Sequence, residues 1–392
     1  MRELVRRIDA ATPAGRDRAV DALRAAAVLG VVLGHWLVTA LVSDSGTLRG
    51  ASPLQDMPQL APVSWVFQTL AVFFLVGGHV GVRSHAAARA HGVTYRSWLG
   101  ARITRLCRPL APLLALWAVA VIAMLAAGTG LDTVRTLVKL VLSPLWFLLV
   151  FAVLTAATPL VARLNPLWPL AVVLHVDLIR FGFGGPDRLG WINLVAGWLV
   201  PYTLGAAWAR GELTGRACRL LVIGGTAAAA GLVLWCGYPA SMVGVPGAQI
   251  SNLNPPTLAA VAFGVAQCGL ALLLLGPLRR AMRRPAAWAA VALVNLSAMT
   301  IFLWHQTALM AVTTAGLLAG PLPGLHTVPG EAGWLVARVA WLPVFGAALA
   351  LCWAAFHPYE QGGRRRSRGA SRVVRRSAPD KPAPRKGGVT HA

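Results

Sequence analysis

The chain has few charged residues, and acidic ones are especially scarce. Asp and Glu together number 13 among 392 residues, and charged residues of both signs make up only 12% of the sequence. Hydrophobic residues make up 57%, and the mean hydropathy is +0.64. Because apolar runs of about 18 or more residues recur along the whole chain, this composition excludes an ordinary soluble domain and predicts a polytopic membrane protein.

Cysteine is scarce as well. The five cysteines lie within or beside apolar segments and form no CxxC pair or other spacing typical of a metal site. We therefore expect them to be packing residues, and we expect no bound metal and no permanently bound cofactor.

Lys and Arg are the one abundant charged class, with 36 residues and a net charge of +23. They are grouped in the gaps between apolar runs and in the last thirty residues, which is typical of loops that face the cytoplasm and anionic lipid. Membrane lipids are therefore the expected partners of this charge, and nucleic acid is not.

The predicted fold class is all-α, a polytopic membrane protein with about ten transmembrane helices. Basic clusters fall in every second gap between the apolar runs, so the positive-inside rule places both termini in the cytoplasm and requires an even number of spans. The predicted spans are residues 22–43, 61–82, 108–127, 143–162, 166–183, 190–209, 217–236, 256–278, 286–317 and 334–356.

Three regions follow from this pattern. Residues 1–21 form a basic cytoplasmic segment, and residues 22–360 form the transmembrane domain. Residues 361–392 mix Lys and Arg with Gly, Ser and Pro, a composition that cannot bury a core, so we predict a disordered basic cytoplasmic tail.

Arg24 and His35 are the most informative pair of residues in the first span. Eleven steps of about 100° return to within roughly 20° of the start, so both side chains lie on one helix face, about 16 Å apart. Ionisable groups inside a membrane are expensive and usually functional. A cation near the cytoplasmic boundary and an imidazole deeper inside would suit a phosphate-bearing acyl carrier with a long arm. The alternative for His35 is an imidazole that only fixes helix packing.

Several stretches, taken in chain order, look like the bacterial acyltransferase-3 family of integral membrane O-acyltransferases. The resemblance covers the first nine predicted spans. It rests on Asp21-Ala-Leu-Arg24 followed by ten residues and His35, on Phe73-Phe74-Leu-Val-Gly77-Gly78, on Arg102-Ile-Thr-Arg105-Leu-Cys-Arg108-Pro109, on Leu145-Trp146-Phe147-Leu148, and on Ser297 through Phe302-Leu303-Trp304-His305.

The resemblance implies an enzyme of the bacterial cytoplasmic membrane that uses acyl-CoA as its donor substrate. Its acceptor would be a hydroxyl of an extracytoplasmic glycan, lipid or small molecule, as in O-acetylation of cell-envelope carbohydrates. Arg24 and His35 match the basic motif that the family carries in its first span. The resemblance also implies that Arg102, Arg105 and Arg108 bind the phosphates of CoA, whereas the alternative is that they are ordinary positive-inside charges.

Asp21 precedes Arg24 by three residues, so it would either orient the guanidinium for the donor or form a simple boundary ion pair. We predict that His35 is catalytic, either as a general base or as the carrier of a transient acyl-imidazole. His305 lies at least as deep as His35, so both could share one cavity as catalytic residues. Alternatively, His305 is a helix-end histidine bonded to Gln306 or to a tryptophan.

Asp177 and Arg180 are spaced to pair on one face of the predicted fifth span. They would either bind acceptor hydroxyls or pair structurally between helices. The competing function is a proton-coupled solute transporter in which the histidines and this pair form a pathway, but the chain shows no internal symmetry of the kind that transporters carry. The sequence does not identify the acyl chain, the acceptor or the oligomeric state.

Overall fold

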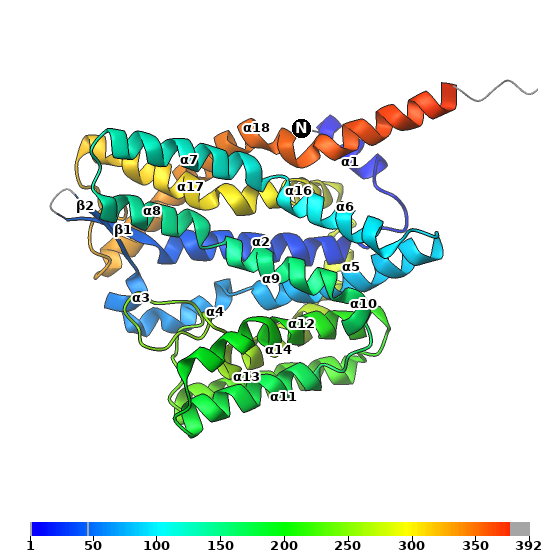
Figure 1. Ribbon diagram of the computed structural model, residues 1–392, viewed down its shortest axis with the longest axis horizontal. Helices are drawn as coiled ribbons and strands as arrows, with labels where there is room; N and C mark the ends of the chain where they lie inside the picture. The colour runs from blue at the N-terminus through cyan, green and yellow to red at the C-terminus, as the bar shows by residue number, and fades with distance from the viewer. Residues whose placement is uncertain (1, 45–46, 377–392) are drawn as a thin grey trace, which may run out of the picture.

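The computed structural model describes residues 2–44 and 47–376, with side chains as far as Glu360. Figure 1 shows a bundle in which the long helices run roughly along one direction. The first half of the chain forms α1 (Arg2–Ala10), α2 (Arg18–Val38), β1 (Ala40–Asp44), β2 (Thr47–Ala51), α3 (Pro53–Asp56), η1 (Pro58–Val63), α4 (Ser64–Phe67), α5 (Leu70–Ala90), α6 (Tyr95–Cys107), α7 (Leu110–Ala126), α8 (Leu131–Leu142), α9 (Leu145–Ala156) and α10 (Thr158–Val161). The second half forms α11 (Leu167–Asp177), η2 (Leu178–Gly182), η3 (Asp187–Ile192), α12 (Asn193–Ala209), α13 (Gly215–Trp235), α14 (Leu258–Leu273), α15 (Leu275–Ala281), α16 (Pro285–Leu296), α17 (Ala298–Gly316), η4 (Leu317–Ala319) and α18 (Ala332–Arg376).

The prediction of an all-α polytopic membrane protein is confirmed. Within the described ranges, eight helical stretches are long and apolar enough to cross a membrane, and the bent pair α14 and α15 would make nine. The span predicted at residues 166–183 corresponds to α11, which has 11 residues, and the π-helical turn η2. Figure 1 places α1 and the far end of α18 at the same end of the bundle. The count of ten spans and the cytoplasmic location of that end stay predictions.

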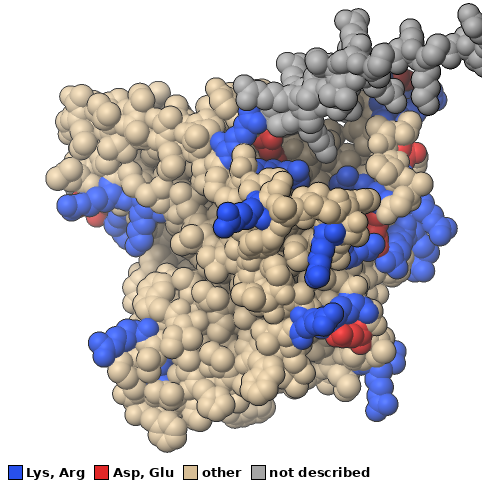
Figure 2. Space-filling view, turned by 45° about the vertical axis from the view of Figure 1, so that its right-hand side comes forward, with Lys and Arg blue, Asp and Glu red and all other residues tan. Residues whose placement is uncertain are grey.

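The basic side chains are unevenly placed. Figure 2 shows most of the Lys and Arg side chains on this face gathered toward the end of the bundle where α1 and the turn between α5 and α6 lie, with fewer at the opposite end. This distribution agrees with the alternation of basic gaps along the sequence and supports the predicted orientation.

The first span was predicted near residues 22–43, and the helix that forms it lies a few residues earlier in the chain. The helix begins at Arg18, because Asp17 is its N-cap and accepts a hydrogen bond from the Ala19 N–H at 3.1 Å. It ends at Val38, since Thr39 adopts an extended backbone with φ −94° and ψ 116°. The next residues form β1, which pairs antiparallel with β2.

Asp17 also pairs with Arg279, whose Nη2 lies 2.7 Å from its carboxylate. Burial favours the neutral acid, but the hydrogen bonds from Arg279 and Ala19 outweigh it and hold the pKa of Asp17 below its usual value of 3.8. The start of α2 is therefore linked to the end of α15 by an ion pair outside the membrane-spanning part.

The span predicted at residues 286–317 is not one helix. The structure breaks it at Ser297 into α16 and α17. At the start of α17, the Glu360 carboxylate accepts hydrogen bonds from the Met299 and Thr300 N–H groups at 3.2 and 3.0 Å. A carboxylate at a helix N-terminus satisfies N–H groups that have no partner inside the helix, so α18 determines where α17 begins.

The basic segment 361–392 was predicted to be disordered. The structure continues α18 through residues 361–376, so the beginning of this segment is helical. Residues 377–392 lie outside the described residues, and for them the disordered tail stays a prediction.

A very close contact between long helices joins α5 and α12. A Cβ atom at Gly78 would lie 2.0 Å from the Tyr202 carbonyl oxygen, and one at Gly205 would lie 2.0 Å from the Leu75 carbonyl oxygen. No side chain fits at either position, so the two glycines allow the backbones to touch. The aromatic core of the bundle surrounds this contact, with Phe74 stacked on Trp198 of α12.

Candidate active site

The helix α2 carries Arg24 and His35 on one face, because residues 18–38 form an uninterrupted α-helix. The exposed side of this helix carries Leu29 and Leu33, which are 39% and 36% exposed. At about 100° per residue, these leucines lie on the side opposite Arg24 and His35. The face that carries the arginine and the histidine is therefore turned into the bundle.

A second histidine lies beside His35. The ring centroids of His35 and His305 are 5.1 Å apart, and the ring planes are inclined by 43°. Gln306, the residue after His305 on α17, places its amide nitrogen 3.1 Å from His35 Nδ1. Trp36 donates its indole N–H to the His305 carbonyl oxygen at 3.0 Å. The structure thus brings together the two histidines predicted to be catalytic, and it adds Gln306 as a partner of His35.

The hydrogen bonds define the tautomer of His305. Its Nδ1 lies 2.6 Å from the Phe302 carbonyl oxygen, which can only accept, so Nδ1 carries a proton, and in the neutral ring Nε2 carries the lone pair. In the described part of the chain this buried Nε2 has no hydrogen-bond partner. At His35, the Gln306 amide can present its nitrogen as a donor or its oxygen as an acceptor to Nδ1, so it can stabilise either neutral tautomer.

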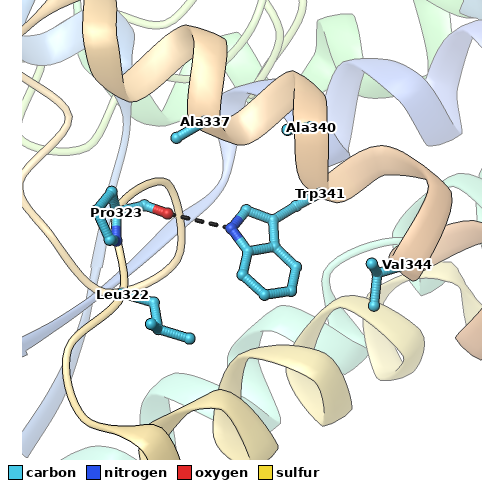
Figure 3. Close-up of a pocket in the computed structure, with 6 residues that line it drawn as sticks. All are labelled: Leu322, Pro323, Ala337, Ala340, Trp341 and Val344. Atoms are coloured by element: carbon cyan, nitrogen blue, oxygen red, sulfur yellow. Dashed lines mark hydrogen bonds between the residues drawn. The ribbon is translucent and has the colours of Figure 1, made fainter.

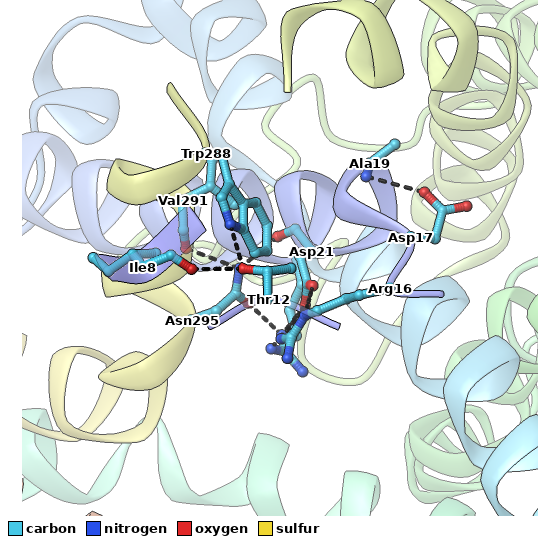
Figure 4. A network of polar contacts seen from close by, with 10 residues as sticks. Ile8, Thr12, Arg16, Asp17, Ala19, Asp21, Trp288, Val291 and Asn295 are labelled. Atoms are coloured by element: carbon cyan, nitrogen blue, oxygen red, sulfur yellow. Dashed lines mark hydrogen bonds and ion pairs between the residues drawn. The ribbon is translucent and has the colours of Figure 1, made fainter. Parts of the chain in front are cut away.

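The other end of this helix face is a charged network. Arg24 donates from Nε to the Asn295 side-chain oxygen at 2.5 Å, and its Nη2 lies 3.3 Å from the Asp21 carboxylate. Asp21 also pairs with Arg16 at 2.5 Å, and its carbonyl accepts from the Asn295 amide at 2.7 Å. Figure 4 shows Arg16, Asp21 and Asn295 together between α2 and α16. The Arg24 side chain is oriented on two sides but remains 32% exposed, so part of it is open to a ligand.

The arginines of α6 approach the same end of the bundle. Arg102 donates to the Ser84 hydroxyl, and its guanidinium lies 5.2 Å from the centroid of the Trp98 ring. The charge of Arg105 acts on both Arg24 and Arg102, so these three cations lie near one another. Arg105 and Arg108 are exposed. A group of guanidinium side chains held close together is typical of a site for a phosphate or carboxylate ligand.

Glu360 is a residue at this end that the sequence analysis missed. Besides the two backbone N–H groups of α17, its carboxylate accepts from the Thr300 hydroxyl at 2.6 Å, and its charge also acts on Arg24. The carboxylate lies at the end of the apolar part of α18, residues 332–360, which is the signal that could have identified it.

Asp177 and Arg180 pair as predicted, with 3.8 Å between Nη1 and the carboxylate. Figure 1 shows α11, which carries Asp177, on the opposite side of the bundle from α17, which carries His305. Helix α11 packs on α12 and α14. The Asp177 carboxylate accepts from the Asn193 amide, the Tyr238 hydroxyl and the Leu258 N–H at 2.9, 3.1 and 2.7 Å. Burial and the nearby Asp177 charge raise the pKa of Tyr238, so this phenol remains a donor. These bonds favour the structural alternative for the pair, and its role in acceptor binding stays a prediction.

Arg338 of α18 is a second residue that the sequence analysis missed. Its side chain is completely buried, and its guanidinium binds backbone carbonyls at the end of α2. An arginine inside an otherwise apolar run was the available signal, because such a residue is expected to have a specific partner.

These features define a multi-pass helical membrane protein in which one helix joins a basic cluster to a histidine pair, with His305 buried and His35 half-buried. The chain belongs to the acyltransferase-3 family, since the profile of that family, an acyltransferase domain, matches residues 17–357. It is therefore a membrane acyltransferase, with an acyl donor, an acceptor and membrane lipids as its partners. Searches among curated proteins and among solved structures gave no match.

Proposed function

We propose that this acyltransferase takes its acyl group from cytoplasmic acyl-CoA and transfers it to a hydroxyl of an extracytoplasmic glycan, lipid or small molecule. The observation that carries the proposal is the face of α2, which joins the Arg24 cluster to the His35 and His305 pair. The rise along eleven helical residues is about 16 Å, comparable to the reach of a pantetheine arm. One donor molecule could therefore contact both ends of this face.

In this proposal the phosphates of the donor bind Arg24, Arg102 and Arg105, with Arg108 at the exposed end of α6. Guanidinium groups bind phosphate oxygens through paired, charge-assisted hydrogen bonds. Asp21 and Asn295 hold the Arg24 side chain in place, so less conformational freedom is lost when the donor binds.

At the other end, His35 takes the proton from the acceptor hydroxyl while the hydroxyl oxygen attacks the thioester carbonyl. The carbon–sulfur bond breaks, and the CoA thiolate receives the proton from His35. The Gln306 amide oxygen can hold the Nδ1 proton while Nε2 acts as the base. The lone pair on His305 Nε2 provides a second proton acceptor beside it. The two-step route through an acyl-imidazole on His35 gives the same products.

The experiment uses the purified full-length protein in detergent with acetyl-CoA and longer acyl-CoA thioesters. We expect saturable acyl-CoA binding by isothermal titration calorimetry. We also expect release of free CoA thiol when an extract of bacterial surface glycans and lipids is added. Mass spectrometry of glycans and lipids from cells with and without the protein then identifies the acyl mass and the acceptor together. Incubation without acceptor distinguishes the two routes, because only an acyl-imidazole leaves an adduct on the peptide that contains His35.

The opposing result would be solute movement in liposomes without CoA binding or thioester turnover, and this result would favour the transporter. The proposed location is the bacterial cytoplasmic membrane, with the basic end of the bundle in the cytoplasm. Reporter fusions after Arg105 and Arg284 should then report a cytoplasmic location, and a fusion after Gly244 should report an external one.

A further inference from the structure

Arg338 lies in the second turn of α18, and its side chain is 0% exposed. Its Nε donates to the Trp36 carbonyl oxygen at 2.6 Å, its Nη1 donates to the Gly324 carbonyl oxygen at 2.9 Å, and its Nη2 donates to the Thr39 carbonyl oxygen. All three acceptors are backbone carbonyls rather than carboxylates. Burying a guanidinium group without a carboxylate partner is unfavourable. An apolar residue would therefore be expected at this position if it served packing alone.

The end of α2 explains why carbonyls are available at this place. The last carbonyl groups of an α-helix have no partner within the helix, and a glycine turn or water usually satisfies them. Here Thr39 is extended and the chain enters β1 at once, so no such turn follows. Arg338 binds two of these carbonyls, and the partial negative charge at the helix C-terminus favours its cation.

His35 lies within the turn of α2 that Arg338 holds. The Thr39 N–H donates to the His35 carbonyl oxygen at 2.9 Å, and the next residue, Trp36, accepts from Arg338 and donates to the His305 carbonyl. The Trp36 ring also packs against Phe345 of α18, with ring centroids 5.6 Å apart. The position of His35 relative to His305 therefore depends on contacts that α18 makes with the end of α2.

We propose that Arg338 is a positioning residue for acyl transfer, which holds the last turn of α2 so that His35 stays beside His305 and Gln306. This inference rests on the proposed function. Helix ends open more readily than helix centres, and a reactive group displaced by about 1 Å can lose roughly 100-fold in rate. A base in the last turn of a helix therefore needs a restraint from outside that helix, and Arg338 provides one.

The neighbouring residues of α18 supply a matched control. Ala337, Ala340, Trp341 and Val344 line a groove of about 400 Å³ beside the loop that contains Pro323 (Figure 3). In this groove the Trp341 indole N–H donates to the Pro323 carbonyl oxygen at 3.1 Å. Trp341 and Arg338 thus both bind the loop before α18, but the hydrogen bonds to α2 come from Arg338. Trp341→Phe removes a bond to the loop without touching a bond to α2.

The experiment compares Arg338→Lys, Arg338→Met and Trp341→Phe with the wild-type protein in detergent. Hydrogen–deuterium exchange of the peptide covering residues 31–40 reports the order of the α2 end. Turnover of acetyl-CoA, divided by the number of acetyl-CoA binding sites, reports the chemical step on folded molecules only. We expect both Arg338 variants to exchange faster in this peptide and to lose about 10- to 100-fold in turnover per site, with Kd for acetyl-CoA unchanged. We expect Trp341→Phe to change neither quantity. If Arg338→Met fails to fold, the conservative Arg338→Lys variant carries the comparison.

Two results would overturn the inference. Unchanged exchange in Arg338→Lys would show that α2 ends in the same way without the guanidinium. Faster exchange with wild-type turnover per site would show that Arg338 is only structural. If the wild-type protein neither binds nor turns over acetyl-CoA or any of the longer acyl-CoA thioesters, the proposed function fails, and the positioning role for acyl transfer fails with it. The exchange comparison then reports separately whether Arg338 holds the end of α2.

Discussion

The pairs Asp21–Arg24 on α2 and Asp177–Arg180 at the end of α11 have the same three-residue spacing but different surroundings. In the first pair the arginine side chain is 32% exposed and has other cations near it. In the second pair the arginine and aspartate side chains are 8% and 1% exposed, and the carboxylate binds three further groups. The same local sequence pattern therefore gives a partly accessible arginine on α2. At the end of α11 it gives a buried ion pair that connects neighbouring helices.

This difference indicates that the groups around an ion pair, rather than its spacing in the sequence, decide whether the arginine can bind a ligand or serves a structural role. At the basic end of α2 the excess of positive charge is left for a ligand to neutralise. At the end of α11 the Asp177 carboxylate accepts hydrogen bonds from α12, α14 and the loop after α13, so a ligand that bound this carboxylate would have to displace contacts between these elements. We therefore expect the two regions to respond to mutation in different measurements.

The largest effect on activity should come from substitution of His35, at the end of α2 where the acyl transfer is proposed to occur. We expect His35→Ala to lower acyl transfer by about 10²- to 10⁴-fold, because a general base is lost, while acyl-CoA binding stays near the wild-type value. The matched control is His175→Ala on α11, an exposed histidine that should leave transfer unchanged. Single-turnover transfer and calorimetric binding measure the two quantities. Normal transfer by a folded His35→Ala protein would show that His35 is a packing residue.

The second effect tests the structural pair. We expect Asp177→Ala to lower the free energy of unfolding by roughly 3–5 kcal/mol, since the buried Arg180 then loses its buried partner and keeps only the exposed Asp187. Denaturant unfolding in detergent measures this loss, and the turnover of the molecules that remain folded should not change. The control is Asp187→Ala, whose carboxylate lies 3.6 Å from Arg180 but is almost fully exposed, and we expect little change there. A specific loss of turnover in folded Asp177→Ala protein would instead support acceptor binding.

The third effect tests the binding pair. We expect Arg24→Ala to weaken acyl-CoA binding by about 1.5–3 kcal/mol, the range for a lost hydrogen bond to a charged group. The corresponding substitution at the other pair, Arg180→Ala, should leave the Kd for acyl-CoA unchanged in whatever protein folds. Calorimetry on both variants measures this contrast. Equal weakening by the two substitutions would remove the distinction between the regions.

The smallest effect concerns another Asp–Arg pair, Asp17–Arg279, which lies outside the membrane-spanning part. In the folded protein the pKa of Asp17 lies below its usual value of 3.8. The pair therefore stabilises the protein fully above about pH 3.8, and this contribution is lost as the pH falls through the pKa of Asp17 in the folded state. We expect Asp17→Asn, which keeps the N-cap oxygen, to lower stability by about 0.2–1 kcal/mol at pH 7. Thermal unfolding between pH 7 and pH 3 should show that the difference in stability between the wild-type and Asp17→Asn proteins decreases as the pH is lowered. A constant difference would assign the loss to the cap instead.

The parts of the fold that depend on local sequence were predictable. Long apolar runs identified the helices, and the eleven-residue spacing between Arg24 and His35 was enough to place both on one helix face. The break at Ser297 was not predictable, since the run from residue 286 to 317 contains no proline or glycine near it. The cap that begins α17 comes from Glu360, about sixty residues later in the chain.

The candidate site shows the same limit. The pairing of His35 with His305 could be proposed from their similar depth, but Gln306 could not be assigned to His35, because helix rotation decides which neighbour faces the ring. Asn295 reaches Arg24 across 271 positions, and Arg338 reaches Trp36 across 302. Contacts between residues so far apart in the chain do not follow from the helical periodicity of the sequence. They follow from how α16, α17 and α18 pack around α2, and a single sequence does not encode that packing in a readable pattern.

The backbone contact between α5 and α12 has a practical consequence for measuring motion in this enzyme. Since the two helices touch at Gly78 and Gly205, they cannot approach further, and sliding would bring carbonyl oxygens into collision. Spin labels at exposed positions such as Ala86 on α5 and Val195 on α12 should report one fixed separation with and without donor. That pair of labels can serve as a fixed reference distance. Any change in the distance from α5 to a label on α18 can then be attributed to movement of α18.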